Sequence, residues 1–147
     1  MVPCKLTLKN FLSYGENAPP LDLESIHVAC LCGANGHGKS ALLDALTWAL
    51  WGRAREAGDD DLIRMHRDEA EVALEFLNDG ARYRVLRRRS RGASRRQART
   101  DLELQVWDGS AYRPIGGSTV RETQAKINDL LRLDYETFVN SAYLLQG

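Results

Sequence analysis

The residues with the clearest chemistry form one glycine-rich run in the first third of the chain. Gly33-Ala34-Asn35-Gly36-His37-Gly38-Lys39-Ser40 matches the pattern G-x-x-x-x-G-K-[ST] at every fixed position. Its glycines allow backbone N–H groups to curl around phosphate oxygens, and a following helix adds partial positive charge at its start. We expect Lys39 to reach the β- and γ-phosphates of ATP and the Ser40 hydroxyl to complete Mg²⁺ coordination. The alternative, a plain glycine turn, gives no reason for Lys-Ser at this offset.

Other polar groups near this run have simpler interpretations. We expect His37 to contribute its backbone N–H rather than its imidazole. Asp44 and the acids at 59–61 are conceivable metal ligands, but a helix-surface carboxylate and a solvated loop explain them more simply. No apolar run ends in Asp-Glu, the usual source of the metal carboxylate and base for phosphoryl transfer to water. The sequence therefore predicts half of an ATPase, which binds ATP without turning it over alone.

The flanking elements place the loop between a strand and a helix. Ile26 to Cys32 is nearly continuous apolar, which is typical of a strand buried on both faces. Gly38 to Trp51 carries leucines at helical spacing, and Gly52 can end that helix as a C-cap. Asn10 to Pro20 is expected to be a loop, and Leu62 to Met65 to form one helical turn.

Strands and short helices account for the rest of the chain. Lys5 to Lys9 alternates as a half-buried strand does. An antiparallel meander is expected over about 70–115, with a hairpin turn at Asn78-Asp79-Gly80 and another turn at Asp108-Gly109. Ser118 or Thr119 can cap a helix, with Glu122 completing a capping box from Thr119, and Asp134 can cap a further short helix through Val139. The apolar positions on one face of the first of these helices are Val120, Ile127, Leu130 and Leu131.

Composition bounds the class of protein. The 147 residues carry 20 Lys+Arg against 20 Asp+Glu and are 44% hydrophobic, as expected for one soluble globular domain. No run of 18 apolar residues and no signal peptide is present, so we expect a cytoplasmic protein without a membrane span. Cys4, Cys30 and Cys32 fit neither a disulfide framework nor a four-ligand zinc site, and buried free thiols are expected.

Positive charge is concentrated in one segment. Nine arginines and no acid lie within residues 82–99, so the rest of the chain is strongly acidic. This segregation predicts a face that meets a polyanion such as DNA, with phosphates contacted from a loop near Arg91 to Ala98. A solvated hairpin is the alternative, because no aromatic residue follows Tyr83 in the segment. Trp48, Trp51 and Tyr83 are expected to pack in the core rather than stack on bases.

Four segments, in this order along the chain, resemble the N-terminal lobe of SbcC-type DNA-repair ATPases, the bacterial counterparts of the eukaryotic double-strand-break ATPase. They are Leu8 to Tyr14, Gly33 to Ala45, Ala49 to Arg55 and Tyr143 to Gly147. The resemblance implies an α/β fold, an ABC-type P-loop NTPase half-domain with an antiparallel β meander packed beside the P-loop strand and helix. Residues 1–147 would form one lobe, with the P-loop at 33–40 and a helical segment and Q-loop at about 118–147.

The same resemblance implies a site for ATP and Mg²⁺. Gln146 is implied to be the Q-loop glutamine, which contacts Mg²⁺ and the attacking water, so Lys39 and Gln146 are the expected catalytic residues and Ser40 and Gln146 the expected metal contacts. Where the family often has an arginine, this chain has Leu12. The implied nucleotide-contacting residues are Ser13, Asn35, Gly36, His37, Gly38, Lys39, Ser40, Ala41, Ile63, Arg64 and Met65.

Partners also follow from the resemblance. A C-terminal lobe would supply the signature motif, the Walker B acids and a switch histidine, beyond a coiled coil with a zinc hook. Two complete heads would sandwich two ATP molecules as a homodimer, bind double-stranded DNA and regulate an SbcD/Mre-type nuclease near the nucleoid. The arginines expected near the DNA are Arg87, Arg88, Arg89, Arg91, Arg95, Arg96 and Arg99.

Three other functions fit parts of the sequence. An SMC or RecF/RecN-type head, from chromosome-maintenance ATPases, shares the loop and the Q-loop. A stand-alone DNA-binding module would use the arginine hairpin and carry a vestigial loop. A small P-loop kinase would need an acceptor site and a lid, for which the sequence offers no candidate.

Overall fold

The computed structural model describes residues 1–24, 39–55 and 58–142, with only the backbone for Lys39, Arg95, Ser141 and Ala142. Four of the sequence predictions lie outside the described residues: the strand Ile26 to Cys32, the thiols of Cys30 and Cys32 within it, the loop from Gly33 to Gly38, and Gln146.

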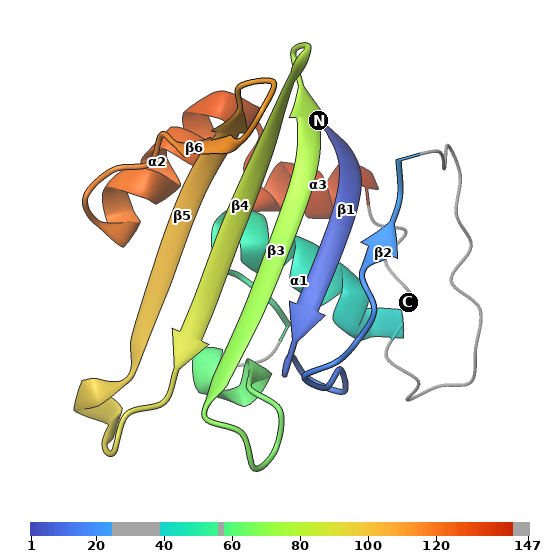
Figure 1. Ribbon diagram of the computed structural model, residues 1–147. Coiled ribbons are helices and arrows are strands. Elements are labelled where there is room, and N and C mark those ends of the chain that lie inside the picture. The colour runs from blue at the N-terminus through green and yellow to red at the C-terminus, as the bar shows by residue number, and fades with distance from the viewer. Residues whose placement is uncertain (25–38, 56–57, 143–147) are drawn as a thin grey trace.

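A six-stranded antiparallel sheet forms the framework of the described chain (Figure 1). Its strand order is β2-β1-β3-β4-β5-β6, and every neighbouring pair is antiparallel. The strands are β1 (Val2–Lys9), β2 (Leu21–Asp22), β3 (Glu69–Asn78), β4 (Ala81–Ser90), β5 (Arg99–Trp107) and β6 (Tyr112–Pro114). The predicted meander is therefore confirmed, as is the strand at Lys5 to Lys9.

The β3–β4 hairpin sets the register of the sheet. Asp79 and Gly80 form its two-residue turn with φ values of 50° and 81°, the positive pair that matches the twist of a hairpin. Alternate residues of β3 then point to opposite faces: Val72, Leu74 and Phe76 are fully buried, while Ala73 and Glu75 between them are partly exposed.

Helices cover one face of the sheet and leave the other open. The helix α1 (Lys39–Trp51) packs against β3 and β4, and α2 (Val120–Leu131) packs against β5 and α1. Figure 1 shows α1 lying behind the strands. The helix α3 (Tyr135–Ala142) follows, and the 3-10 turns η1 (Asp59–Leu62) and η2 (Arg95–Gln97) lie in connections. Between these layers, Trp48, Leu74 and Ile127 belong to one hydrophobic core.

Local signals predicted the helix boundaries well. Gly52 has φ 68° and its N–H donates to the carbonyl of Trp48, so α1 ends where expected. Thr119 accepts the N–H of Glu122 at 3.1 Å, and Asp134 accepts that of Thr137 at 2.7 Å. The predicted helical turn at Leu62 to Met65 is wrong: η1 ends at Leu62, and Ile63 is extended because its backbone pairs with Phe11.

Candidate functional site

The start of α1 is the structural basis of the predicted phosphate site. Lys39 and Ser40 are the first two residues of the helix, directly after the glycine-rich run, and Ser40 is exposed. Ala41 is buried, so its side chain anchors the helix and leaves only its backbone for a ligand. The first turn of α1 contains no acid, so no carboxylate of that turn offsets the partial positive charge there. The described part of the site therefore suits an anion.

Packing along α1 fixes the direction in which that start points. Ala45, Trp48 and Ala49 are fully buried against the sheet, and the two alanines permit close approach of the helix. The ring of Trp48 lies 5.6 Å from that of Phe11, which is two residues past the end of β1. The helix is thus held at its centre, several residues away from the predicted phosphate contacts.

Two segments far apart in the sequence meet beside β1 and form a second candidate contact area. The N–H of Leu12 donates to the carbonyl of Leu62 at 2.8 Å, and the N–H of Arg64 donates to the carbonyl of Asn10 at 2.8 Å. The Arg64 guanidinium also donates to the carbonyl of Ser13. The structure therefore brings together four of the predicted nucleotide contacts: Ser13, Ile63, Arg64 and Met65.

Exposure differs among these four residues. Ser13 is exposed and Met65 is 77% exposed, whereas Ile63 is buried in the core. Any contact from Ile63 would come from its backbone. Met65 is the most exposed large hydrophobic side chain described, as a residue that meets a ligand surface would be.

Three of the four acids weighed as metal ligands have structural partners instead. Asp44 is buried, which corrects the prediction of a helix-surface carboxylate, because Arg55 donates to it from both the side chain, at 3.0 and 3.1 Å, and the backbone. Asp59 accepts the indole N–H of Trp48, and Asp60 pairs with Arg89 at 2.9 Å. Among the described residues, no group of three metal-binding side chains converges on one point.

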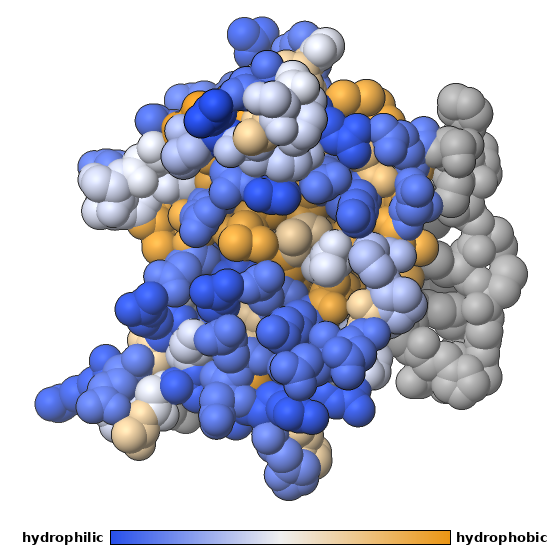
Figure 2. All heavy atoms as spheres, in the orientation of Figure 1, coloured by the Kyte–Doolittle hydropathy of each residue, from blue (hydrophilic) through white to orange (hydrophobic). Residues whose placement is uncertain are grey.

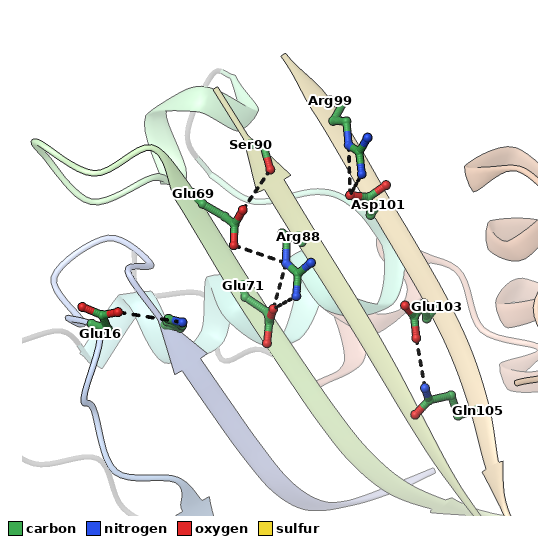
Figure 3. A network of polar contacts seen from close by, with 10 residues as sticks. Glu16, Glu69, Glu71, Arg88, Ser90, Arg99, Asp101, Glu103 and Gln105 are labelled. Carbon is green, nitrogen blue, oxygen red and sulfur yellow. Dashed lines mark hydrogen bonds and ion pairs between the residues drawn. The ribbon is translucent and has the colours of Figure 1, made fainter. Parts of the chain in front are cut away.

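The arginines of β4 that face the open side of the sheet are paired with acids of neighbouring strands. Arg84 lies opposite Glu75, and Arg88 lies opposite both Glu71 on β3 and Asp101 on β5. Arg88 donates to Glu71, and Figure 3 shows this contact between β4 and β3, with Arg99 and Asp101 forming a separate pair on β5. The hydrogen bond from Arg88 to Glu71 raises the pKa of Arg88 above its usual value.

The predicted segregation of charge therefore holds along the sequence and fails in space. Strand pairing places the acids of β3 and β5 beside the arginines of β4, and Figure 2 shows hydrophilic residues over much of this face around a smaller hydrophobic area. The position of the hairpin turn in the sequence could have predicted this pairing of acids with arginines. Counting outward from Asp79-Gly80 brings Glu75 opposite Arg84 and Glu71 opposite Arg88.

Arg87 cannot serve as the DNA contact that the sequence predicted. Its side chain faces the helices, the residue is only 3% exposed, and its guanidinium donates to the carbonyl of Ala49 and to Gln124. The Arg89 guanidinium also has partners within the chain, because it donates hydrogen bonds to Asp60 and Thr100. The exposed arginines of the predicted set lie in and beside the β4–β5 connection; they are Arg91, Arg96 and Arg99, of which Arg99 pairs with Asp101.

The aromatic residues and one cysteine pack as predicted. Trp48 is fully buried, the indole N–H of Trp51 donates to the carbonyl of Leu133 at 3.0 Å, and Tyr83 stacks on Phe76. Cys4 is a buried free thiol, and burial raises its pKa. The described helices include none that is both long and apolar enough to cross a membrane.

Comparison with known proteins agrees with this architecture. A family model described as an AAA domain matches residues 5–147. The SbcC component of the nuclease SbcCD from Deinococcus radiodurans is 34% identical over an alignment of 151 positions, which covers all of this chain and 16% of that protein. The DNA double-strand break repair Rad50 ATPase from Halobacterium salinarum is 38% identical over 97% of this chain and 15% of its own length. The chain thus spans about a sixth of these curated relatives, and the predicted resemblance is confirmed.

A solved structure shows the same fold. The recombination mediator protein RecF, in its ATP form from the RecFOR pathway, superposes with a TM-score of 0.56 at 15% identity. The likeness covers 76% of this chain and 27% of that one. It confirms the predicted α/β fold class, and the predicted meander packs beside α1.

Proposed function

The chain belongs to the AAA-domain family, and from that premise we propose that it is the ATP-binding N-terminal lobe of a DNA double-strand-break repair ATPase. One observation carries the proposal: the pattern G-x-x-x-x-G-K-S runs directly into α1, whose start is free of acids and whose centre is clamped to the sheet. The relatives named as a component of the nuclease SbcCD and as a Rad50 ATPase support the assignment to repair.

The nucleotide site is built from two parts. Backbone N–H groups of Asn35 to Gly38 surround the phosphates, Lys39 neutralises the β- and γ-phosphates, and Ser40 holds Mg²⁺, with Ala41 contributing its backbone. Bound Mg²⁺ supplies charge neutralisation between these phosphates. The area formed by Ser13, Ile63, Arg64 and Met65 faces the base, which accounts for the exposure of Met65.

Hydrolysis belongs to the complete head in this proposal. Gln146 positions Mg²⁺ and water, while a C-terminal lobe adds the remaining catalytic groups, so residues 1–147 alone bind ATP without turnover. Two heads close on ATP as a homodimer and regulate a nuclease of the SbcD/Mre type. The name of the relative from Deinococcus radiodurans, which is part of a nuclease, supports this last step.

Double-stranded DNA contacts the β4–β5 connection. Arg91 and Arg96 are exposed there, and the backbone of Arg95 lies between them. Phosphates bound by such side chains add affinity that depends on salt and not on sequence. Arg88, Arg89 and Arg99 contribute less because acids already hold them, and Arg87 does not take part.

The test is ATP affinity of the full-length protein carrying Lys39→Ala, measured by calorimetry with Mg²⁺ present. Loss of the phosphate-binding ammonium should weaken binding by roughly tenfold or more. Lys5→Ala is the matched control, since Lys5 is an exposed lysine of β1 on the sheet. Equal affinity of Lys39→Ala and Lys5→Ala would refute the assignment.

A further inference from the structure

A groove outside the proposed nucleotide site lies between the C-terminal end of α1 and the first turns of α2. The groove is open to solvent and has a volume of about 610 Å³. Its lining consists of Trp51, Gly52, Arg87, Val120, Arg121, Gln124, Ala125 and Asn128. The groove contains two arginines and two side-chain amides, and the lining residues that the structure describes include no carboxylate.

Arg87 lies at the floor of this groove as a buried cation without an acidic partner. Its Nε and Nη2 donate to the carbonyl of Ala49 at 3.3 and 3.2 Å, and its Nη2 donates to Oε1 of Gln124. None of the ion pairs found among the described residues includes Arg87. Burial lowers the pKa of Arg87 to about 10, and the negative charge of Asp59, which acts in the opposite direction, is the smaller effect. Neutral oxygens therefore carry all of its hydrogen bonds in the described chain.

A buried guanidinium that is bonded only to neutral oxygens lowers the stability of the fold if its role is purely structural. A buried charge is normally paired, because its desolvation is offset only by a close opposite charge. The same strand follows this rule elsewhere: Arg84, Arg88 and Arg89 all lie against acids. Arg87 is the exception on β4, and it is the one that faces the groove.

A glycine lies against the guanidinium of Arg87. Gly52 has no side chain, and a Cβ built there would lie 3.0 Å from Nη1 of Arg87. Gly52 also adopts φ 68°, so glycine serves both the end of the helix and access to the guanidinium. Trp51, Val120 and Ala125 give the groove apolar walls beside this charge.

We propose that the groove receives an aspartate or glutamate side chain from a docked protein segment, which forms an ion pair with Arg87. Charge complementarity determines the chemistry of the occupant, because Arg87 and Arg121 both line the groove. The depth of Arg87 favours a side chain over a DNA phosphate, since a carboxylate on a flexible stem reaches a recessed cation and its methylenes cover the apolar walls. None of the residues that line the groove belongs to the proposed nucleotide site or to the β4–β5 connection.

The experiment uses photo-crosslinking in the purified full-length protein. A benzophenone amino acid replaces Val120, which is 38% exposed at the groove, and in a second sample replaces exposed Asn128. After irradiation without DNA, mass spectrometry should identify one protein segment with an aspartate or glutamate within one helical turn of the crosslink.

Gln124→Glu then tests the role of charge. This isosteric change places a carboxylate against the Arg87 guanidinium from within the chain, so the docked acid loses its partner and crosslinking should fall roughly tenfold. Gln105→Glu is the matched control, because Gln105 accepts a hydrogen bond from Arg84 on the open face, far from the groove.

Four results would overturn the proposal. They are the absence of crosslinks from both probe positions, a crosslinked segment without an acid, crosslinking that appears only when DNA is added and reaches only DNA, and a yield that Gln124→Glu leaves unchanged relative to Gln105→Glu.

Discussion

Arg87 and Arg88 are adjacent in β4 and lie on opposite faces of the sheet. Arg87 points under the helices, is 3% exposed and bonds only to neutral oxygens. Arg88 points to the open face, where Glu71 and Glu69 hold it within reach of solvent. One face thus buries its arginine among neutral oxygens and the other holds its arginine in a solvated ion pair, so the two side chains should contribute very differently to the free energy of unfolding.

The largest expected effect is on unfolding of the Arg87→Ala variant. Removal of this side chain leaves a cavity beside Trp48 and leaves the carbonyl of Ala49 without its donor, which should cost about 3 kcal/mol. Arg88→Ala breaks a partly exposed pair and should cost about 0.5 kcal/mol. Urea unfolding of both variants measures the difference. Similar losses for the two would remove the contrast between the faces.

An intermediate effect is expected at Gly52. Gly52→Ala forces a left-handed residue to carry a Cβ and pushes that Cβ against Arg87, for a total of about 2 kcal/mol. Gly80→Ala isolates the backbone part, because Gly80 has φ 81° but no atom within 4 Å of its would-be Cβ, and should cost about 1 kcal/mol. Equal unfolding free energies for the two variants would show that Arg87 yields freely and does not press on Gly52.

The sequence predicted correctly those features that depend on residues close together in the chain. The hairpin turn at Asp79-Gly80, the caps at Thr119 and Asp134, and the end of α1 at Gly52 all depend on residues within a few positions of each other. Local backbone preferences decide such features, so they can be predicted directly from the residue types.

Predictions failed where distant segments decide the environment. Asp44 has the character of a surface acid in its own helix, and it is buried because Arg55 folds back over it. Arg87 carries the same charge as its neighbours, and only the packing of α1 and α2 hides it. Periodicity in β4 assigns alternate residues to two faces, but it does not say which face the helices cover.

The candidate site likewise has features that the sequence predicted and features that only the structure showed. The start of α1 at Lys39 followed from the glycine-rich pattern and the leucine spacing. The meeting of Ser13 with Arg64 rested on the family resemblance, since the Arg64 side chain reaches the Ser13 carbonyl across 51 positions in a contact with no local signal. The exposure of Met65 and the burial of Ile63 then needed the structure, because the packing of this segment against distant residues decides which side chain reaches solvent.

The smallest expected effect is the response of the open-face pairs to salt. Glu71→Gln removes one charge beside Arg88 and should cost about 0.5 kcal/mol at low salt. At 1 M NaCl the screening length falls to about 3 Å, so this cost should largely disappear. The cost of Arg87→Ala should persist at both salt concentrations, because a cavity and an unsatisfied buried carbonyl do not depend on ions. Urea unfolding in both salts tests this, and a Glu71→Gln penalty that survives 1 M NaCl would mean that the open-face network is as shielded from solvent as the helix-covered side.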